Sequence, residues 1–283
     1  MLPRRRASAD ALMQLQQIAA AKLGLEPRPG KELLLQARTN KHMRELGVSD
    51  AAEYMRLVEG DGTGERIQEL MDLLTTNHTA FWREPGHFEW LREHLPETCR
   101  GGGRITIWCA GAASGEEAYT LAMVAREALG PAAAGRVQIL ATDVSTRMLR
   151  AGRAGIYSRE RIRPLPEVWQ RQYFTALGGE ECQVDAEIRG MVHFRRLNLI
   201  EPLPRMGPFP YIFCRNVMIY FSRETRQRVV GELMEHLTPD GHLVVGSAEG
   251  LGGLETETDF VRPAIYRLKQ EQAAASPEAK AWP

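Results

Sequence analysis

The sequence predicts an α/β protein, with a doubly wound and mainly parallel sheet preceded by an all-helical domain. Three observations lead to this prediction. No strand pattern occurs before residue 104, residues 104–129 have the pattern of a strand, a tight turn and a helix, and strand-like and helix-like runs alternate from there to residue 268. Such alternation is typical of a parallel sheet with helices on both faces.

The first 76 residues predict a helical domain. Leu12, Leu15 and Ile18 recur at helical spacing, and the pattern resumes over residues 31–46. Asp50 is expected to cap a further helix, because Glu53 completes a capping-box-like pattern. The last helix of this domain is expected over residues 65–74, and residues 77–103 are expected to link it to the sheet domain through a helix over residues 85–95.

Residues 104–268 predict the sheet domain. A small antiparallel excursion is expected at about 176–195, a closing hairpin at 260–268, and a polar tail at 269–283. The expected strands are 104–109, 137–142, 191–197, 210–215, 242–247 and 264–268, and the main helices are 116–129, 145–152 and 222–237.

The turn after the first strand carries small residues at Gly111, Ala113 and Gly115, and then two acids, Glu116 and Glu117. Small side chains allow a ligand to approach the backbone, but the G-x-G-x-x-G spacing of a pyrophosphate site is absent. Two carboxylates at a helix start also repel phosphate. The turn therefore favours a cationic ligand such as S-adenosylmethionine over a dinucleotide, with an ordinary tight turn as the alternative.

Polar residues follow three other strands. Asp143 ends the second strand, where a carboxylate can accept ribose hydroxyls, although it could instead cap the next helix. Asn198 follows the third strand, and Arg215 and Asn216 follow the fourth, where they are expected to point into a ligand crevice. The alternative for Arg215 and Asn216 is a satisfied polar pair at a strand end.

A polar cluster precedes the sheet domain at Asn77, Thr79 and Arg83, with two aromatic residues between them. Chemistry alone favours a capped helix start for this segment, with an aromatic anchor.

Composition narrows the possible classes of protein. Basic and acidic residues balance at 36 each, so net charge does not indicate nucleic-acid binding. The four cysteines form no C-x-x-C pair, which argues against a zinc site or a disulfide framework, and no metal is expected. No apolar run is as long as a membrane span. We expect a soluble, cytoplasmic monomer.

Five motifs then occur in a fixed order: TTNHTAFWREPGHF, WCAGAASGEEAYTLAM, LATDVS, LNLIEPLP and FCRNVMIYFS. Together they resemble the chemoreceptor glutamate methyltransferases, the CheR family, over roughly residues 10–268. The resemblance implies a class I S-adenosylmethionine-dependent methyltransferase with a helical N-terminal domain and an inserted β-subdomain. The segment 173–194 is slightly shorter than the matching segment of members whose β-subdomain grips a receptor tail peptide.

The resemblance also implies the site. Arg83 and Tyr220 match the positions that face the methyl-transfer centre, which replaces the capped-helix interpretation of residues 77–83. The residues expected to line the S-adenosylmethionine site are Asn77, Thr79, Arg83, Glu116, Asp143, Asn198, Leu199, Arg215 and Asn216.

The family's acceptor is a glutamate carboxylate in the cytoplasmic helical signalling domain of a chemoreceptor. Arg38, Lys41 and Arg44 step along one predicted helix and could dock such an acidic helix, or could form an ordinary solvated face. Two other classes stay open: a methyltransferase acting on a small carboxylic acid, and a non-catalytic module that binds S-adenosylmethionine.

Overall fold

The computed structural model describes residues 17, 21–24, 32–48, 50–62, 64–75, 77–254 and 258–269. The helical pattern predicted around Leu12 to Ile18 and the tail predicted beyond residue 269 therefore lie largely outside the described residues. The chain divides into two compact units. The smaller unit takes the residues up to Thr76 together with Tyr220–Ser222, and the larger unit takes the others.

The described part of the smaller unit is helical. Its middle helix begins where the sequence predicts, because the Asp50 side chain accepts a hydrogen bond from the main-chain N–H of Glu53 at 3.3 Å. Tyr54, Val58 and Leu70 are fully buried in its core. The helices are α2 (Glu32–Glu45), α3 (Ala51–Glu59) and α4 (Glu65–Leu74).

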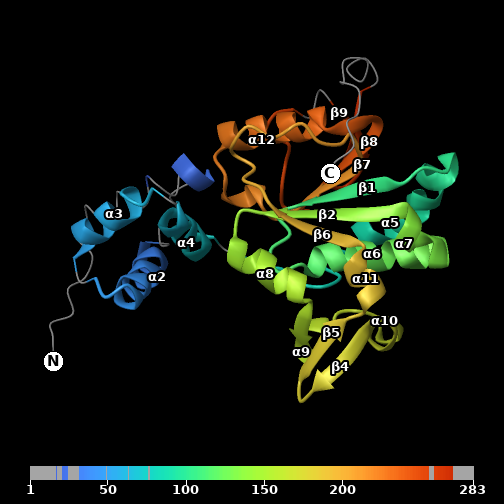
Figure 1. Ribbon diagram of the computed structural model, residues 1–283. Helices are drawn as coiled ribbons and strands as arrows, with labels where there is room; N and C mark the ends of the chain where they lie inside the picture. The colour runs from blue at the N-terminus through green and yellow to red at the C-terminus, as the bar shows by residue number, and fades with distance from the viewer. Residues whose placement is uncertain are drawn as a thin grey trace. The chain divides into compact units, whose positions relative to one another are not determined.

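The larger unit is built on a seven-stranded sheet with the order β6-β2-β1-β7-β8-β10-β9 (Figure 1). The first five strands of this order are parallel, and β10 runs antiparallel to both β8 and β9. The last two strands are the closing hairpin that the sequence predicts. The strands are β1 (Ile105–Ala110), β2 (Val137–Asp143), β6 (Val192–Arg196), β7 (Phe209–Cys214), β8 (Leu237–Val245), β9 (Thr258–Arg262) and β10 (Ile265–Leu268).

Helices cover both faces of this sheet. Figure 1 shows α12 on one face and α6 on the other, as expected of a doubly wound sheet. The helices are α5 (Pro85–Thr98), α6 (Glu116–Leu129), α7 (Ala133–Arg136), α8 (Thr146–Ala154), α11 (Ala186–Gly190) and α12 (Arg223–Glu235), with short 3₁₀ turns η1 (Cys99–Gly101), η2 (Gly130–Ala132) and η3 (Met218–Tyr220).

The segment 77–103, expected to be a linker, belongs to the larger unit. Its helix α5 packs against α6, and Phe88, Trp90 and Leu91 are at most 2% exposed in the main hydrophobic core. Burial of such large side chains stabilises the unit by about 1.5–3 kcal/mol each. The segment is therefore part of the sheet domain.

The inserted subdomain carries a three-stranded antiparallel sheet with the order β3-β5-β4. Its sheet spans residues 156–184, not about 176–195 as the sequence alternation suggests. The alternation from Ala186 onward belongs to helix α11, which Asp185 caps, and residues 192–196 belong to the main sheet. The subdomain elements are β3 (Ile156–Ser158), α9 (Arg159–Ile162), α10 (Glu167–Gln172), β4 (Phe174–Gly178) and β5 (Glu181–Val184).

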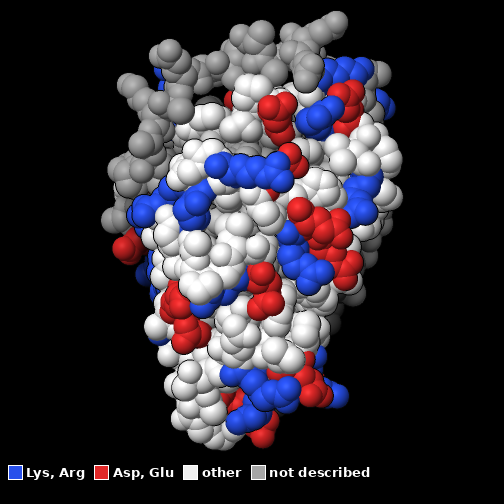
Figure 2. Space-filling view, turned by 90° about the vertical axis from the view of Figure 1, so that its right-hand side faces the viewer, with Lys and Arg blue, Asp and Glu red and all other residues white. Residues whose placement is uncertain are grey.

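All four cysteines are buried and free of disulfides. Cys109 and Cys214 lie in the core strands where the sequence places them. Basic and acidic side chains are interspersed over the face shown in Figure 2, so that face presents no broad field of one sign. Within the described ranges, no helix combines the length and the apolar character needed to cross a membrane.

Candidate functional site

Five of the predicted site residues follow or end parallel strands of the main sheet: Asp143 at β2, Asn198 and Leu199 after β6, and Arg215 and Asn216 after β7. The chain runs from β1 outward to β2 and β6, and then returns to β7 on the other side of β1. Ligands of open α/β sheets bind at such a switch point, beyond the carboxyl ends of the strands. Asp143 ends β2, and Arg215 directly follows β7, so both lie at this edge.

The small residues of the turn after β1 are required by the fold itself. Gly111 and Gly115 have φ values of 86° and 96°, in the left-handed region that favours glycine. A Cβ atom on Gly115 would lie 3.0 Å from the ring of Phe194 and 3.1 Å from the hydroxyl of Tyr157. The N–H of Gly111 also donates to the carbonyl of Thr142 at 2.8 Å, which ties the turn to β2.

Asp143 is buried and holds the same turn. Its Oδ2 accepts a hydrogen bond from the N–H of Ala113 and its Oδ1 one from the N–H of Ser145, both at 2.8 Å. The cap of helix α8 is Ser145, whose hydroxyl accepts from the N–H of Met148 at 3.2 Å. The N-cap position of α8 is therefore Ser145 and not Asp143. Each carboxylate oxygen can accept more than one hydrogen bond, so the group keeps the chemistry of a ribose acceptor.

Asn198 and Leu199 follow β6 beside Asp143, and each is 7% exposed. The N–H of Leu197 donates to the main-chain carbonyl of Asp143 at 3.1 Å, which joins the two strand ends. The Asn198 amide donates to Glu201 Oε1 at 3.0 Å.

The polar segment before α5 is an irregular loop that ends where Pro85 begins the helix. Asn77 and Thr79 are half-buried in it. Arg83 keeps 34% of its side chain exposed, and its Nη1 donates a hydrogen bond to the carbonyl of His78 at 3.3 Å.

Glu116 does not face solvent. Its side chain is fully buried, and it accepts a hydrogen bond from the Ser114 hydroxyl at 2.8 Å and forms an ion pair with Arg161 of α9. Burial raises the pKa of Glu116, and the charge of Arg161 opposes that rise. In this conformation, a contact between Glu116 and a cofactor has to come from its main chain.

Arg215 also turns inward, and not into a crevice as the sequence suggests. Its side chain is fully buried, 2.8 Å from Glu117 Oε2 and 3.3 Å from Glu84 Oε2, and its Nη2 donates to the main-chain carbonyl of Arg83 at 2.5 Å. Its guanidinium also lies over the ring of Phe88. Two carboxylates compensate the buried charge, which corresponds to the satisfied-pair alternative.

Glu84 is a site residue that the sequence reasoning missed. Burial raises its pKa, but hydrogen bonds from the N–H and hydroxyl of Ser247, at 3.0 and 2.9 Å, together with Arg215 and Asn216, bring the pKa down to about 2. Glu84 is therefore an anion that joins the Arg83 loop to the ends of β7 and β8.

Glu249 is a second missed residue, in a segment to which the sequence reasoning assigned no role. Its buried carboxylate accepts hydrogen bonds from the N–H groups of Asn216 and Gly246 at 2.7 Å and of Ile219 at 2.9 Å. These bonds hold Asn216 at a φ of 59°. A Cβ on Gly246 would lie 2.5 Å from the Asn216 amide. The sequence signal of this close approach between β8 and Asn216 is Gly246, which directly follows β8.

The remaining predicted residues lie in the smaller unit. Tyr220 is half-buried in η3 and groups with that unit, so its catalytic role stays a prediction. Arg38 donates to the carbonyls of Leu73, Leu74 and Thr75 at 3.1–3.3 Å, and so caps the end of α4. Lys41 and Arg44 are exposed. Docking therefore stays a prediction for Lys41 and Arg44, whereas the Arg38 side chain is engaged in capping α4.

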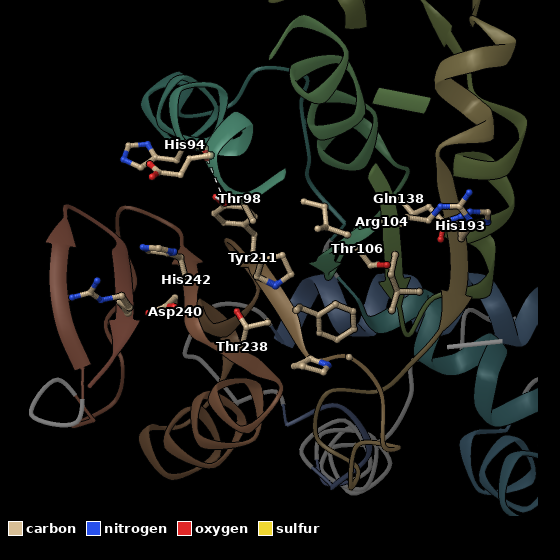
Figure 3. A pocket seen from close by; sticks show the side chains of 18 of the residues that line it. His94, Thr98, Arg104, Thr106, Gln138, His193, Tyr211, Thr238, Asp240 and His242 are labelled. Atoms are coloured by element: carbon tan, nitrogen blue, oxygen red, sulfur yellow. Dashed lines mark hydrogen bonds between the residues drawn. The ribbon is translucent and has the colours of Figure 1, made fainter. Parts of the chain in front are cut away.

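A cleft of about 1530 Å³ lies at the opposite, amino-terminal edge of the sheet. Figure 3 shows it with Tyr211 in its wall. The hydroxyls of Thr98 and Tyr211 lie 2.5 Å apart. No predicted site residue lines this cleft.

Comparisons with known proteins identify the family of the chain. The family model "CheR methyltransferase, SAM binding domain" matches residues 77–266, and "CheR methyltransferase, all-alpha domain" matches residues 10–75. The chemotaxis protein methyltransferase of Borreliella burgdorferi is 35% identical over 266 residues, covering 91% of this chain and 94% of the relative. That of Escherichia coli K12 is 34% identical and covers 94% of each chain.

Chemotaxis protein methyltransferase 1 of Pseudomonas aeruginosa is 38% identical over 251 residues, covering 84% of this chain and 90% of the relative. The domain matches together span nearly all of the chain, and their boundary falls where the structure divides into its two units. The chain belongs to the CheR family of chemotaxis methyltransferases, whose larger domain binds S-adenosylmethionine.

Proposed function

We propose that this chain transfers the methyl group of S-adenosylmethionine to glutamate side chains of chemoreceptors, giving glutamyl methyl esters. Membership of the CheR family and the names of its relatives support the methyl transfer. The observation that supports a carboxylate acceptor is the partial exposure of the Arg83 side chain, at the end of the segment 77–83.

The donor set at the carboxyl edge fits S-adenosylmethionine. Asp143 presents a buried carboxylate where ribose hydroxyls need an acceptor. The other family motifs contribute the amides of Asn77 and Asn198 and the hydroxyl of Thr79. Arg215, a basic side chain at this edge, is enclosed by Glu84 and Glu117 and does not offer its charge to an anionic ligand. Bound there, the cofactor supplies an electrophilic methyl group on a sulfonium sulfur.

The proposed cofactor residues divide into two groups. We place Asn77, Thr79, Asp143, Asn198 and Leu199 in contact with the cofactor through their side chains or main chain. Glu116, Arg215 and Asn216 make a different contribution, because the first two side chains are fully buried and Asn216 is held by Glu249 and Glu84. Their role is to fix the loop backbones that bound the site.

Arg83 is the proposed clamp on the acceptor carboxylate. Its nearest carboxylate is Glu84, with Oε1 at 4.0 Å from the Arg83 Nε, but hydrogen bonds from Ser247 and Asn216 and the charge of Arg215 already engage that group. The guanidinium of Arg83 therefore keeps donors for an incoming carboxylate, which it can hold through two oxygens at once. Tyr220 is proposed as the second residue facing the acceptor.

The chain needs no general base for this reaction. A glutamate with an ordinary pKa of about 4.3 is ionised at pH 7. The site has to orient the carboxylate and exclude water, because opposite charges are neutralised as the reaction proceeds. Orientation of this kind can supply ~7–11 kcal/mol in favourable cases. Arg83 must not bind the acceptor much more strongly before transfer than during it.

The proposed partner is the acidic, helical signalling domain of a chemoreceptor in the cytoplasm. Lys41 and Arg44 are the basic side chains proposed to dock it, since both are exposed on α2. We further propose that the protein acts as a monomer.

Incubation with radiolabelled S-adenosylmethionine tests the proposal. Candidate receptor signalling domains and a panel of small carboxylic acids would serve as acceptors, and base-labile label would be counted. Label on the receptor supports the proposal. Label only on a small acid would identify a small-molecule carboxyl methyltransferase, and tight cofactor binding without transfer to any acceptor would indicate a binding module.

A further inference from the structure

The inserted subdomain reaches directly into the cofactor loop. The hydroxyl of Tyr157, in strand β3, donates a hydrogen bond to the main-chain carbonyl of Ser114 at 2.6 Å, and both atoms are buried. The same hydroxyl lies against Gly115, where a Cβ atom would come within 3.1 Å of it. A residue of the subdomain therefore fixes two consecutive residues of the turn between β1 and α6.

Arg161, on helix α9 of the subdomain, makes a second connection. It forms an ion pair with the fully buried Glu116, and its Nη2 donates to the hydroxyl of Ser114 at 3.3 Å. Its guanidinium lies 5.7 Å from the centre of the Tyr157 ring. A buried carboxylate at a helix start is costly unless it is paired, so Arg161 helps to determine whether Glu116 can occupy that position.

Aromatic contacts join the subdomain to the other proposed ligand segment. Phe81 packs edge-on against Tyr157, with ring centres 4.9 Å apart, and against Phe174 at 5.6 Å. Trp82 packs edge-on against Trp169 at 4.9 Å. Phe81, Tyr157 and Trp169 belong to the same hydrophobic core as the sheet, and the partly buried Trp82 and Phe174 pack against it, so the subdomain is not a separately packed appendage.

We infer that the inserted subdomain is a structural part of the cofactor site, and that Tyr157 and Arg161 are positioning residues for the loop Gly111–Glu116. This inference rests on the proposed function, because it assumes that this loop bounds the S-adenosylmethionine site. It gives the subdomain a role that is independent of any grip on a receptor tail. Loss of either connection should weaken cofactor binding even when no receptor is present.

Replacement of Tyr157 by phenylalanine tests the inference with a close control in the same subdomain. Tyr173, like Tyr157, is 3% exposed and packs in the main core, but its hydroxyl bonds to Glu127 on α6 and not to the cofactor loop. Tyr157→Phe and Tyr173→Phe therefore each remove one hydrogen-bonding hydroxyl from a core tyrosine of the subdomain, and only that of Tyr157 bonds to the cofactor loop. Titration calorimetry with S-adenosylhomocysteine would measure affinity, and thermal unfolding without ligand would measure stability.

We expect Tyr157→Phe to raise the Kd for S-adenosylhomocysteine about 5–10-fold, the effect of one lost hydrogen bond, and Tyr173→Phe to change it less than about twofold. Similar unfolding midpoints for the two variants would show that the difference lies in the site. Wild-type affinity in Tyr157→Phe would overturn the inference. If the wild-type protein itself fails to bind S-adenosylhomocysteine, the proposed function fails instead.

Arg161 gives a second comparison that does not depend on Tyr157. Arg161→Lys keeps a charge near Glu116, whereas Arg161→Gln removes it, so the Lys variant should bind S-adenosylhomocysteine more tightly than the Gln variant. If the Gln variant does not fold, the double variant Arg161→Gln with Glu116→Gln takes its place. It removes both charges of the ion pair, so we expect it to fold. Equal affinity in the wild-type, Lys and double variants would contradict a positioning role for Arg161.

Discussion

The carboxylate of Asp143 accepts a hydrogen bond from the main-chain N–H of Ala113 at 2.8 Å, so the end of β2 and the turn after β1 form one connected structure. The two residues are 30 positions apart in the chain. Through this bond the side chain holds the turn after β1, while its carboxylate oxygens can still accept further hydrogen bonds.

The first prediction follows from this relationship. Asp143→Asn should weaken S-adenosylhomocysteine binding by roughly 1.5–3 kcal/mol, because hydrogen bonds to a charged acceptor are lost. Asp185→Asn is the matched control, since Asp185 also lies at a strand end and accepts from the N–H two residues later at 2.8 Å. Calorimetry giving equal affinities for the two variants would remove Asp143 from the site.

The second prediction concerns Arg83. Arg83→Ala should lower turnover on receptor fragments by about 30-fold or more, because a charge pair with the acceptor is worth roughly 2 kcal/mol or more. Binding of S-adenosylhomocysteine should change much less. Arg92→Ala, at an exposed position of α5, should leave both quantities at wild-type values. Equal losses of turnover and cofactor affinity would make Arg83 mainly a cofactor ligand.

The third prediction separates docking from folding in the smaller unit. Because Arg38 caps α4, its reversal would damage the fold, so the test uses Lys41→Glu with Arg44→Glu. This double variant should raise the KM for receptor and spare cofactor affinity. Added salt should weaken the wild-type enzyme in the same direction, since exposed charges are screened over ~8–10 Å.

A charge-matched control for this experiment is Arg92→Glu with Arg100→Glu in the larger unit, where both residues are exposed. If both double variants raise the receptor KM equally, overall charge and not α2 attracts the receptor. A large loss of methylation on deleting the receptor tail, with no response to salt or charge reversal, would place recognition elsewhere.

The fourth prediction concerns acid stability. Burial and the nearby charge of Arg215 lower the pKa of His87 from 6.5 to about 4, so the folded protein keeps this side chain neutral. Below pH 6.5 the unfolded chain binds the proton more readily. The free energy of unfolding should therefore fall as the pH drops from about 6.5 to 4, by up to about 3 kcal/mol from this group.

Thermal unfolding at several pH values checks this prediction. His87→Gln should flatten the dependence between pH 6.5 and 4, whereas His193→Gln, at an exposed position, should keep the wild-type slope. His242, whose pKa burial also lowers to about 4, keeps part of the slope in both variants. An unchanged slope in His87→Gln would contradict the assignment.

The sequence predicts the core of the fold well, because the signals are local. Apolar runs such as that of β7 mark buried parallel strands, and the turn at Gly111–Gly115 indicates the edge at which a ligand is proposed to bind. The subdomain is harder to predict, because β3 has three residues and the alternation after Cys182 runs into a helix.

The surroundings of the site residues could not be read from the sequence. Arg215 is expected at a strand end, but the groups that turn it inward are Glu117, 98 residues away, and the loop of Arg83, 132 residues away. Glu116 is expected at a helix start, but its partner Arg161 comes from the inserted subdomain. Local patterns give the position of a charge, and only tertiary structure shows which groups compensate it.

Mass spectrometry of a receptor signalling domain, after incubation with the protein and S-adenosylmethionine, tests most directly whether a glutamate side chain is the acceptor. The proposed chemistry predicts methyl esters on glutamate residues that disappear after mild base treatment and that form much more slowly with Arg83→Ala. Base-stable methylation on lysine, arginine or another nitrogen, formed by the wild-type protein, would contradict carboxylate transfer.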